Sequence, residues 1–427
     1  MRRRVLVIAY YFPPSGGPGV QRTLKFVKYL PELGWEPVVL TARDADYPAL
    51  DPSLLDEVPK GIRVYRTFIP EPYRLYRKLT GRSAGEAVDI ATLTRTSVDK
   101  SKLSERVAEF VRSCFFIPDA RVGWLPFAVR AASRVIRKER VEVLYSSAPP
   151  YTCHLIGLAL KKRFGLPWVA DFRDSWVGWL SAPTRPSLPH RIDCALERAV
   201  LKNADKILTV SRGIAEDLQK RNPDLDESKW TILPNGYDRA DFEGVRPAGD
   251  HSRFTITYTG SLYGPRNPET LLMALEELLQ ERPEIGRQLK LRFVGRIGKA
   301  IEEMLRKPGW DSMVEIVPYV SHQESIGYLL GSDAALLIID DAPANRGILT
   351  GKLFEYLGAG KPILALAPEG DAAELIRELR AGQVVYPKDV QGIREALLSL
   401  IQKRQNNGRW CWKKWISRRS SSLNEEI

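Results

Sequence analysis

The chain has 427 residues and a formal net charge of +12, with 44% hydrophobic and 27% charged residues. These values are typical of a soluble globular protein with two domains of ordinary size, and they exclude fibrous, collagen-like and disordered classes. The four cysteines and four histidines are scattered along the chain, without pairs at metal-ligand spacing. The sequence therefore predicts neither a disulfide framework nor a metal site.

The start of the chain, three arginines followed by an apolar run over residues 5–12, resembles a secretory signal. The run is short, is stopped by Pro13 and Pro14, and lacks a small-residue cleavage site, so it predicts a first β-strand. No apolar run approaches the roughly 18 residues of a membrane span. The basic charge favours phosphates or an anionic membrane surface over nucleic acid, for which no motif is present.

Short apolar runs alternate with helical patterns along the first 238 residues. The predicted strands cover residues 5–9, 35–41, 62–66, 141–146, 168–171, 206–210 and 230–233. The predicted helices cover residues 20–33, 127–138, 151–164, 188–203 and 212–221. This alternation predicts an amino-terminal domain, residues 1–238, with a parallel sheet covered by helices on both faces.

The segment at about 71–122 fits this alternation least well, because it mixes aromatic and basic side chains without a clear period. Two interpretations remain open. The segment is either a helical insertion packed on its own apolar side, or an amphipathic surface that touches anionic lipid or holds a large acceptor.

A polar stretch with Gly and Pro, residues 239–252, predicts a linker, after which the alternation restarts. The predicted strands cover residues 254–259, 289–294, 314–318, 334–339 and 362–367, and the predicted helices 268–281, 324–330, 351–358 and 371–380. We expect two successive doubly wound, Rossmann-like α/β domains, the second over residues 253–404. The basic, Trp-rich tail, residues 405–427, suits either a membrane-surface foot or a disordered or altered terminus.

In open parallel α/β sheets, ligands bind at the carboxyl ends of the strands. After the first strand, Gly16 and Gly17 let the backbone approach a ligand and precede a helix that directs amides at an anion. A purely structural turn is the alternative. Asp171, Arg173 and Asp174 follow a buried strand, where charges are unfavourable unless paired or used. We favour acceptor binding or catalysis, and an ion pair that pins the loop is the alternative.

In the second domain, Gly260 allows close approach, and Arg266 can place a fixed positive charge beside a diphosphate. Lys352 and the amides of its helix form an anion site. Glu355 falls on the same helix face and can accept both hydrogen bonds from a ribose diol. The alternative is a simple surface Lys–Glu pair.

Together these residues resemble the GT-B glycosyltransferases, specifically the large retaining family that moves sugars from nucleotide donors (family 4 in the usual classification). The resemblance runs from about residue 4 to 400. Its motifs occupy residues 11–19, 146–150, 169–174, 209–212, 233–237, 258–261 and 352–362.

The resemblance implies an acceptor-binding amino domain, a nucleotide-binding carboxyl domain, and transfer with retention but without a cofactor or obligatory metal. It implies a catalytic role around Asp171, Arg173 and Asp174, although relatives often carry a histidine where Arg173 stands. Glu355 matches the carboxylate that holds the ribose. The residues expected to contact the donor diphosphate are Gly16, Gly17, Gly260, Arg266 and Lys352.

One departure from the family concerns the sugar end of the site. Relatives often have two glutamates spaced E-x7-E, but Gly347 stands eight positions before Glu355. Asp341, Arg346 and Gly347 are the candidates for contact with the sugar in this chain.

We expect a hexosyltransferase-like enzyme that moves a sugar from a nucleotide-sugar donor, with UDP-sugars favoured, to a glycan or lipid-linked acceptor. The expected role is in cell-surface polysaccharide or glycoconjugate synthesis, in the cytoplasm or peripherally at the inner face of the cell membrane. Two alternatives remain: a nucleotide-sugar epimerase of the same architecture, or a non-catalytic scaffold on a membrane surface.

Overall fold

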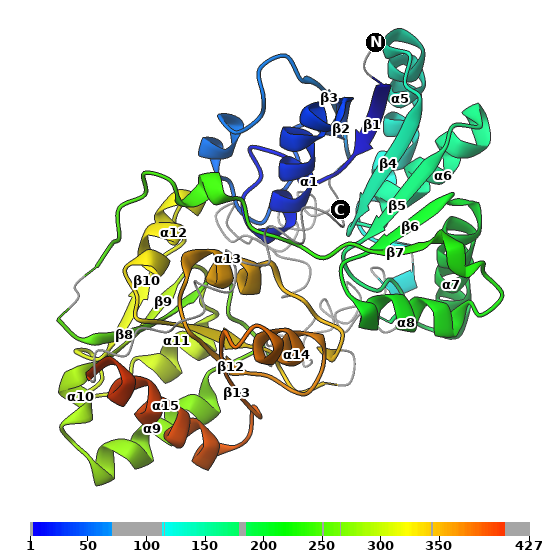
Figure 1. Cartoon of the computed structure of the whole chain (residues 1–427). Helices are drawn as coiled ribbons and strands as arrows, with labels where there is room; N and C mark the ends of the chain where they lie inside the picture. Colours follow the sequence, from blue (N-terminus) through cyan, green and yellow to red (C-terminus); the bar gives the residue numbers. More distant parts are fainter. Residues whose placement is uncertain are drawn as a thin grey trace. The chain divides into compact units, whose positions relative to one another are not determined.

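The computed structural model describes residues 3–70, 113–114, 116–178, 185–249, 252–264, 266–342 and 345–405. The chain divides after Pro234 into two compact units (Figure 1). Most of the segment expected to be an insertion, and nearly all of the tail, lie outside the described residues. Among the helices of the described ranges, none combines the length and the apolar character that a membrane crossing requires.

The first unit contains a seven-stranded parallel sheet in the order β3-β2-β1-β4-β5-β6-β7. Its strands are β1 (Arg3–Ile8), β2 (Trp35–Ala42), β3 (Arg63–Thr67), β4 (Val143–Ala148), β5 (Trp168–Phe172), β6 (Lys206–Thr209) and β7 (Trp230–Ile232). Its α-helices are α1 (Pro18–Tyr29), α5 (Leu125–Glu139), α6 (Thr152–Phe164), α7 (Ser187–Asn203) and α8 (Arg212–Arg221). Its short 3-10 helices are η1 (Leu30–Leu33), η2 (Pro52–Leu55), η3 (Val122–Trp124) and η4 (Glu227–Lys229).

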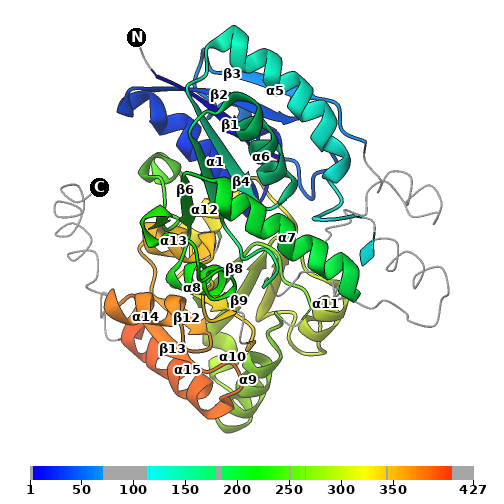
Figure 2. The same ribbon diagram turned by 90° about the vertical axis from the view of Figure 1, so that its right-hand side faces the viewer.

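Apolar side chains on both faces of this sheet build its core, as expected for a parallel sheet covered by helices. Leu6 and Ile8 of β1 pack in one buried cluster with α5, α6 and α7 (Figure 2). Val5 and Val7 alternate with them and pack with Val27 of α1 in another cluster. The period of two along β1 thus assigns α1 to the face opposite α5 and α6.

The second unit contains a six-stranded parallel sheet in the order β10-β9-β8-β11-β12-β13. Its strands are β8 (Phe254–Thr259), β9 (Leu289–Val294), β10 (Val314–Val317), β11 (Ala334–Ile338), β12 (Ile363–Leu366) and β13 (Gly382–Val385). Its helices are η5 (Arg239–Phe242), α9 (Glu269–Glu281), α10 (Ile285–Gln288), α11 (Lys299–Leu305), α12 (His322–Leu330), α13 (Gly351–Ala359), α14 (Asp371–Glu378) and α15 (Val390–Gln405).

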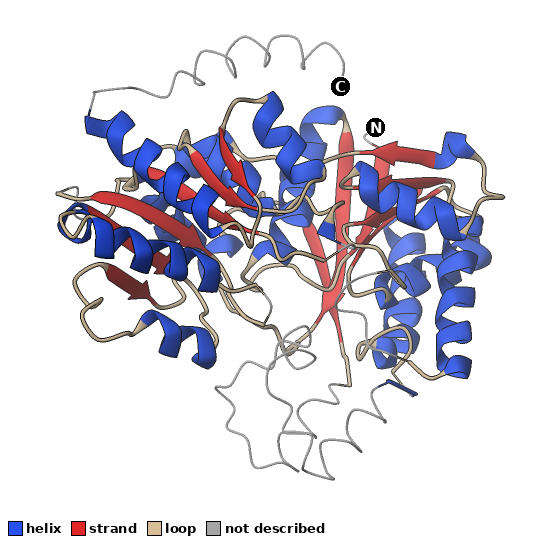
Figure 3. Ribbon diagram, turned by 90° about the horizontal axis from the view of Figure 1, so that it is seen from below, coloured by secondary structure: helices blue, strands red, loops and turns tan. Residues whose placement is uncertain are grey.

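The helices of the second unit also divide between the two faces of the sheet (Figure 3). Leu336 of β11 packs in a cluster with α9, α11 and α15, whereas Leu337 packs in a cluster with α12, α13 and α14. In each unit the strand order reverses at one point, between β1 and β4 and between β8 and β11. These two switch points are where an open α/β sheet binds its ligands.

The predicted fold class, two Rossmann-like α/β domains, is confirmed. Four of the described strands and α-helices were absent from the prediction: α10, α11, β13 and α15. β13 is short, half-buried and begins at Gly382, where a Cβ would lie 1.9 Å from the carbonyl oxygen of Ile363. The stretch expected to be a linker contains η5, whose Phe242 packs on the cluster that includes α13.

A histidine is buried in the core of the first unit. His154 of α6 is fully buried, and its Nδ1 lies 2.8 Å from Ser146 Oγ. Burial lowers the pKa of His154 to about 3. In the unfolded chain, the histidine has its ordinary pKa and becomes protonated below pH ~6.5. In the folded unit, His154 stays neutral until the pH approaches 3.

We therefore expect the stability of the first unit to be constant above pH ~6.5 and to fall as the pH decreases towards 3. At pH ~5 the contribution of His154 is a loss of about 2 kcal/mol. Urea unfolding at several pH values measures it, with His154→Gln as the comparison. An equally steep decline in the His154→Gln protein would contradict the assignment, because the substitution removes the titrating group.

Candidate functional site

A lysine lies at the carboxyl end of β8 in the second unit. Lys352 is in the first turn of α13, and its Nζ donates a hydrogen bond to Tyr258 Oη at 2.5 Å. The Nζ also lies 4.0 Å from the centre of the Tyr258 ring. Burial, aided by the nearby positive charge of Arg266, lowers the pKa of Lys352 well below its ordinary 10.5, and Glu355 opposes this only in part. The lysine charge is therefore poorly compensated by the protein itself.

Arg266 brings a second cation to the same place. Its side chain forms a hydrogen bond with Tyr258, and its Nε lies 4.0 Å from Asp340 Oδ1. This Nε is buried and has no hydrogen-bond partner within the described ranges. Because neighbouring cations repel and a buried unpaired N–H is unfavourable, the arrangement suits a bound anion.

The start of α13 adds backbone donors to the two cations. Thr350 occupies the N-cap position without a side-chain cap hydrogen bond. Its Oγ1 is buried and, as far as the structure is described, has no partner. The first-turn amides of an uncapped helix favour an anion through their N–H groups and the helix dipole. The helix start and the two cations thus bring N–H donors and positive charge together at the sheet edge, an arrangement that suits a bound anion.

Gly260 makes room for the lysine. Its φ of 99° lies in the left-handed region, and a Cβ there would be 2.6 Å from Lys352 Cε. Next to it, a Cβ on Gly295 would be 2.4 Å from the Gly260 carbonyl oxygen. The loops after β8 and β9 therefore approach each other and α13 only because both residues lack side chains.

Gly260→Ala is expected to weaken anion binding at this position by about tenfold, because the added methyl group displaces the lysine ammonium from its position. Isothermal titration calorimetry with UDP, a nucleotide of the class expected from the sequence, measures the change. Gly309→Ala is the matched control, since Gly309 has a φ of 86° but open space around its Cβ position. Equal losses in the two variants would attribute the effect to backbone strain alone.

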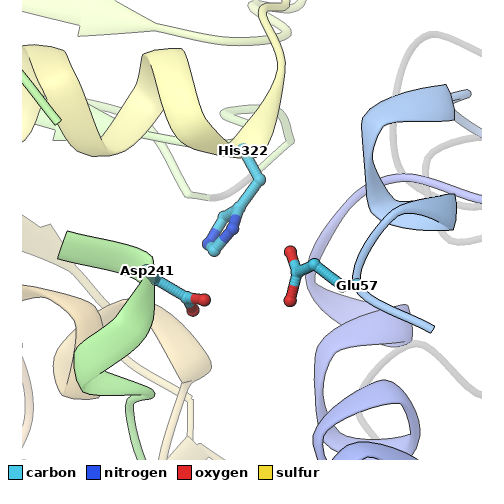
Figure 4. Close-up of side chains that lie close together, drawn as sticks. All are labelled: Glu57, Asp241 and His322. Atoms are coloured by element: carbon cyan, nitrogen blue, oxygen red, sulfur yellow. The ribbon is translucent and has the colours of Figure 1, made fainter. Parts of the chain in front are cut away.

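Glu355 lies one turn further along α13 and has an unexpected neighbour. Its Oε1 lies 3.2 Å from Nε2 of His322, the first residue of α12. Figure 4 shows the His322 ring turned towards the carboxylate of Asp241, with a ring nitrogen within 4.8 Å of a carboxylate oxygen. The capping box of Ser321 and Glu324, which marks the start of α12 after β10, was the available sequence signal for this residue.

Tyr356, between the lysine and the next turn, fixes the position of α13. Its hydroxyl donates to the Leu336 carbonyl oxygen and accepts from the Thr259 amide, both at 3.1 Å. Tyr356 is fully buried and thereby connects the helix to β8 and β11. The orientation of Lys352 and Glu355 is consequently held by the core and not by surface contacts.

The candidates for the sugar end of the site lie in the loop after β11. The Asp341 carboxylate accepts hydrogen bonds from Tyr386 and from Lys388 Nζ. The Arg346 carbonyl oxygen accepts from the Asp371 amide at 2.8 Å. Gly347 follows in the same loop, which the structure describes only in part. The strongest contacts of Asp341 are thus with the neighbouring β13 loop.

The two glycines in the loop after β1 differ in their contacts. The Gly16 amide donates to the Ala49 carbonyl oxygen at 2.9 Å. Gly17, with a φ of 85°, is the N-cap residue of α1 and has no side chain to cap the helix. The start of α1 therefore has the properties of an anion-binding helix end, whereas the Gly16 amide serves the fold.

Asp171 lies at the centre of a buried network. Its carboxylate accepts hydrogen bonds from Arg22 (2.8 Å), Tyr145 (2.6 Å) and Ser147 (3.0 Å). The side chain is fully buried. Burial alone raises the pKa of Asp171, but the charge and hydrogen bonds of Arg22, with the hydrogen bond of Tyr145, outweigh it and hold the pKa below 3.8. This geometry fits the ion-pair interpretation, with a partner, Arg22, that spacing along the loop does not indicate.

Arg173 connects three segments at the carboxyl edge of the first sheet. Its guanidinium donates to the carbonyl oxygens of Gly19 (2.6 Å), Ala148 (3.2 Å) and Pro149. The neighbouring Asp174 accepts a hydrogen bond from Tyr151 through its carbonyl oxygen at 3.3 Å. Arg173, in the loop after β5, thus connects that loop to the first turn of α1 and to the end of β4.

Family models match both units. A glycosyl transferase 4-like domain matches residues 16–236, and glycosyl transferases group 1 matches residues 253–403. Spore coat protein SA of Bacillus subtilis (strain 168) is 22% identical over 358 residues, which cover 69% of this chain and 90% of that protein.

Solved structures share the fold at low identity. Sucrose-phosphate synthase from Thermosynechococcus elongatus aligns with a TM-score of 0.60 at 16% identity, covering 100% of this chain and 99% of that one. An E. coli structure described as trehalose-6-phosphate bound with UDP-2-fluoro glucose aligns with a TM-score of 0.61 at 12% identity, covering 99% and 94%.

The two Rossmann-like units and the matching family models define an enzyme of the GT-B glycosyltransferase class. The chain belongs to the glycosyl transferases of the family 4 type, whose models match more than half of its residues. This membership supports glycosyl transfer over the epimerase and scaffold alternatives.

Proposed function

We propose that this protein moves a sugar from a nucleotide-diphosphate sugar, with a UDP-sugar favoured, to a glycan or lipid-linked acceptor, with retention of anomeric configuration. The observation that carries the proposal is the meeting of Lys352 and Arg266 at Tyr258. Within the described residues, Arg266 has a long contact of 4.0 Å with Asp340, and Glu355 offsets the burial of Lys352 only in part. A diphosphate supplies the missing negative charge.

In this proposal the two cations and the α13 amides act most strongly when the sugar leaves. Cleavage of the bond between sugar and phosphate leaves additional negative charge on the departing nucleoside diphosphate. Lys352 and Arg266 stabilise that charge without a metal ion. Glu355 accepts hydrogen bonds from the ribose hydroxyls, and His322 orients its carboxylate through the contact at 3.2 Å.

The choice of UDP is supported by one structural relative, which is described as holding UDP-2-fluoro glucose. The acceptor is proposed to bind the first unit, where Arg173 connects the loop after β5 to the start of α1 and the end of β4 at the carboxyl edge of the sheet. Synthesis of cell-surface polysaccharide or glycoconjugate at the inner face of the cell membrane is the setting that this chemistry suits.

A thermal-shift panel of UDP-, GDP- and ADP-sugars tests the donor proposal, since a ligand that binds only the folded protein raises the melting temperature. We expect one nucleotide class to stabilise the protein and its sugar to appear on a second molecule during turnover. Conversion of the donor into another nucleotide sugar, with no sugar transferred, would contradict the proposal. So would the absence of stabilisation by all three classes.

A further inference from the structure

The first unit also carries a basic pocket on two of its helices. The pocket is open, has a volume of about 310 Å³ and lies along α5 and the end of α6. These two helices lie side by side in Figure 2 and pack together in the core. Four exposed arginines line it: Arg130, Arg134, Arg137 and Arg163. We call it the α5 pocket.

The arginines of the α5 pocket have no anionic partner among the described residues. Arg130, Arg134 and Arg137 repeat along one face of α5, where like charges repel. Glu139, the acid of this helix, is buried and pairs with Arg63 and Tyr65 instead. Nothing in the described ranges therefore offsets the concentrated positive charge.

Two of the guanidinium groups are held in place by a shared aromatic ring. Arg137 lies 5.7 Å and Arg163 5.8 Å from the centre of the Phe164 ring. Both are in the last turns of their helices, where a cation also favours the helix dipole. That effect does not extend to Arg130 and Arg134, which lie in earlier turns. The helix dipole thus accounts for the positions of Arg137 and Arg163 but not for those of Arg130 and Arg134. A bound anion would account for the latter pair.

The last turns of α5 and α6, which carry Arg137 and Arg163, are separate from the carboxyl edge of the sheet. α5 ends just before β4 begins, and α6 ends just before β5 begins, so their last turns lie at the amino edge. The loops with Gly17 and Arg173 lie at the opposite, carboxyl edge. At the start of α5, exposed Phe127 packs edge to face against exposed Phe68, with ring centres 5.0 Å apart. An apolar pair thus lies beside the cationic row.

We propose that the α5 pocket binds a phosphate group, carried either by a lipid headgroup or by a soluble phosphate compound. Guanidinium groups bind phosphate oxygens through paired N–H donors. Four arginines in one pocket, without an anionic partner in the described residues, are not explained by a role in the fold. The site is independent of the donor site proposed for the second unit, and its failure would leave that proposal unaffected.

The test uses Arg130→Gln/Arg134→Gln, because both positions are exposed and glutamine favours helices. The control, Lys220→Gln/Arg287→Gln, removes the same charge from exposed positions elsewhere. One arm measures co-sedimentation with phosphatidylglycerol–phosphatidylcholine vesicles. The other titrates sodium pyrophosphate into Lys352→Met protein, which keeps the donor site from contributing. Melting temperatures confirm that each variant is folded.

We expect the pocket variant to bind vesicles or pyrophosphate about thirtyfold more weakly, with the control nearly unchanged. Loss confined to vesicles identifies a lipid source, and loss confined to pyrophosphate identifies a soluble one. Undiminished binding of both probes by the pocket variant would overturn the proposal. Equal loss in the pocket variant and the control would also overturn it, because net charge alone would then account for the binding.

Discussion

Replacing Lys352 by methionine is expected to lower kcat/KM for sugar transfer by about a hundredfold to a thousandfold, the usual effect of removing one group that stabilises developing charge. Methionine keeps most of the volume and removes only the ammonium. The fold should persist, because the free protein gains little from a partly buried lysine whose pKa is held well below 10.5.

The same observation predicts proton uptake on donor binding. A diphosphate beside Lys352 raises the pKa of the lysine, so donor affinity should fall as the pH rises through that raised value. Calorimetry in buffers of different ionisation enthalpy measures the protons taken up, which should vanish in Lys352→Met. Lys220→Met, an exposed lysine on α8, is the control. Wild-type turnover in Lys352→Met would remove the lysine from the donor site.

Replacing Asp171 by alanine is expected to destabilise the first unit by about 3–5 kcal/mol, the usual result of removing one partner from a buried ion pair. The reason is that Arg22 would remain buried without its carboxylate, while Tyr145 and Ser147 would lose their acceptor. Urea unfolding of the full chain, followed by tryptophan fluorescence, measures the change.

This result also separates the two interpretations of the Asp171 loop. Asp224→Ala is the matched control, because Asp224 forms an ion pair with Arg198 on the surface and should change stability very little. Asp171→Ala protein that keeps its stability but loses transfer would favour a catalytic aspartate. Loss of stability, with Arg22→Met giving a similar loss, would establish the structural ion pair.

Most of the strands could be predicted because buried parallel strands are short apolar runs that differ sharply from their flanking turns. β8 and β9 begin and end at their predicted residues. β13 was missed because an edge strand with half-buried side chains lacks that contrast. α11 was missed because its seven residues span too few turns to show a helical period.

Some residues of the candidate site could likewise be predicted from the sequence, and others could not. Lys352 and Glu355 were predictable because they lie on one helix, where a spacing of three residues determines a shared face. Arg266 was predictable only as a nearby charge, since its contact with Tyr258 depends on how the loop after β8 folds back. His322 was not predicted, because 33 residues separate it from Glu355.

The sequence alone determined that this protein has two parallel α/β units and that a cationic helix start follows a strand in the second. Both are local properties, set by the periods of side chains along strands and helices. Only the tertiary structure decided which charged side chains form ion pairs that stabilise the fold. Asp171 and Arg22 lie far apart in sequence and become a buried pair because β5 and α1 meet at one edge of the first sheet. In the described residues of the second unit, the Asp340 carboxylate is 4.0 Å from Arg266, and Glu355 offsets the burial of Lys352 only in part, so both cations are less fully compensated than Arg22.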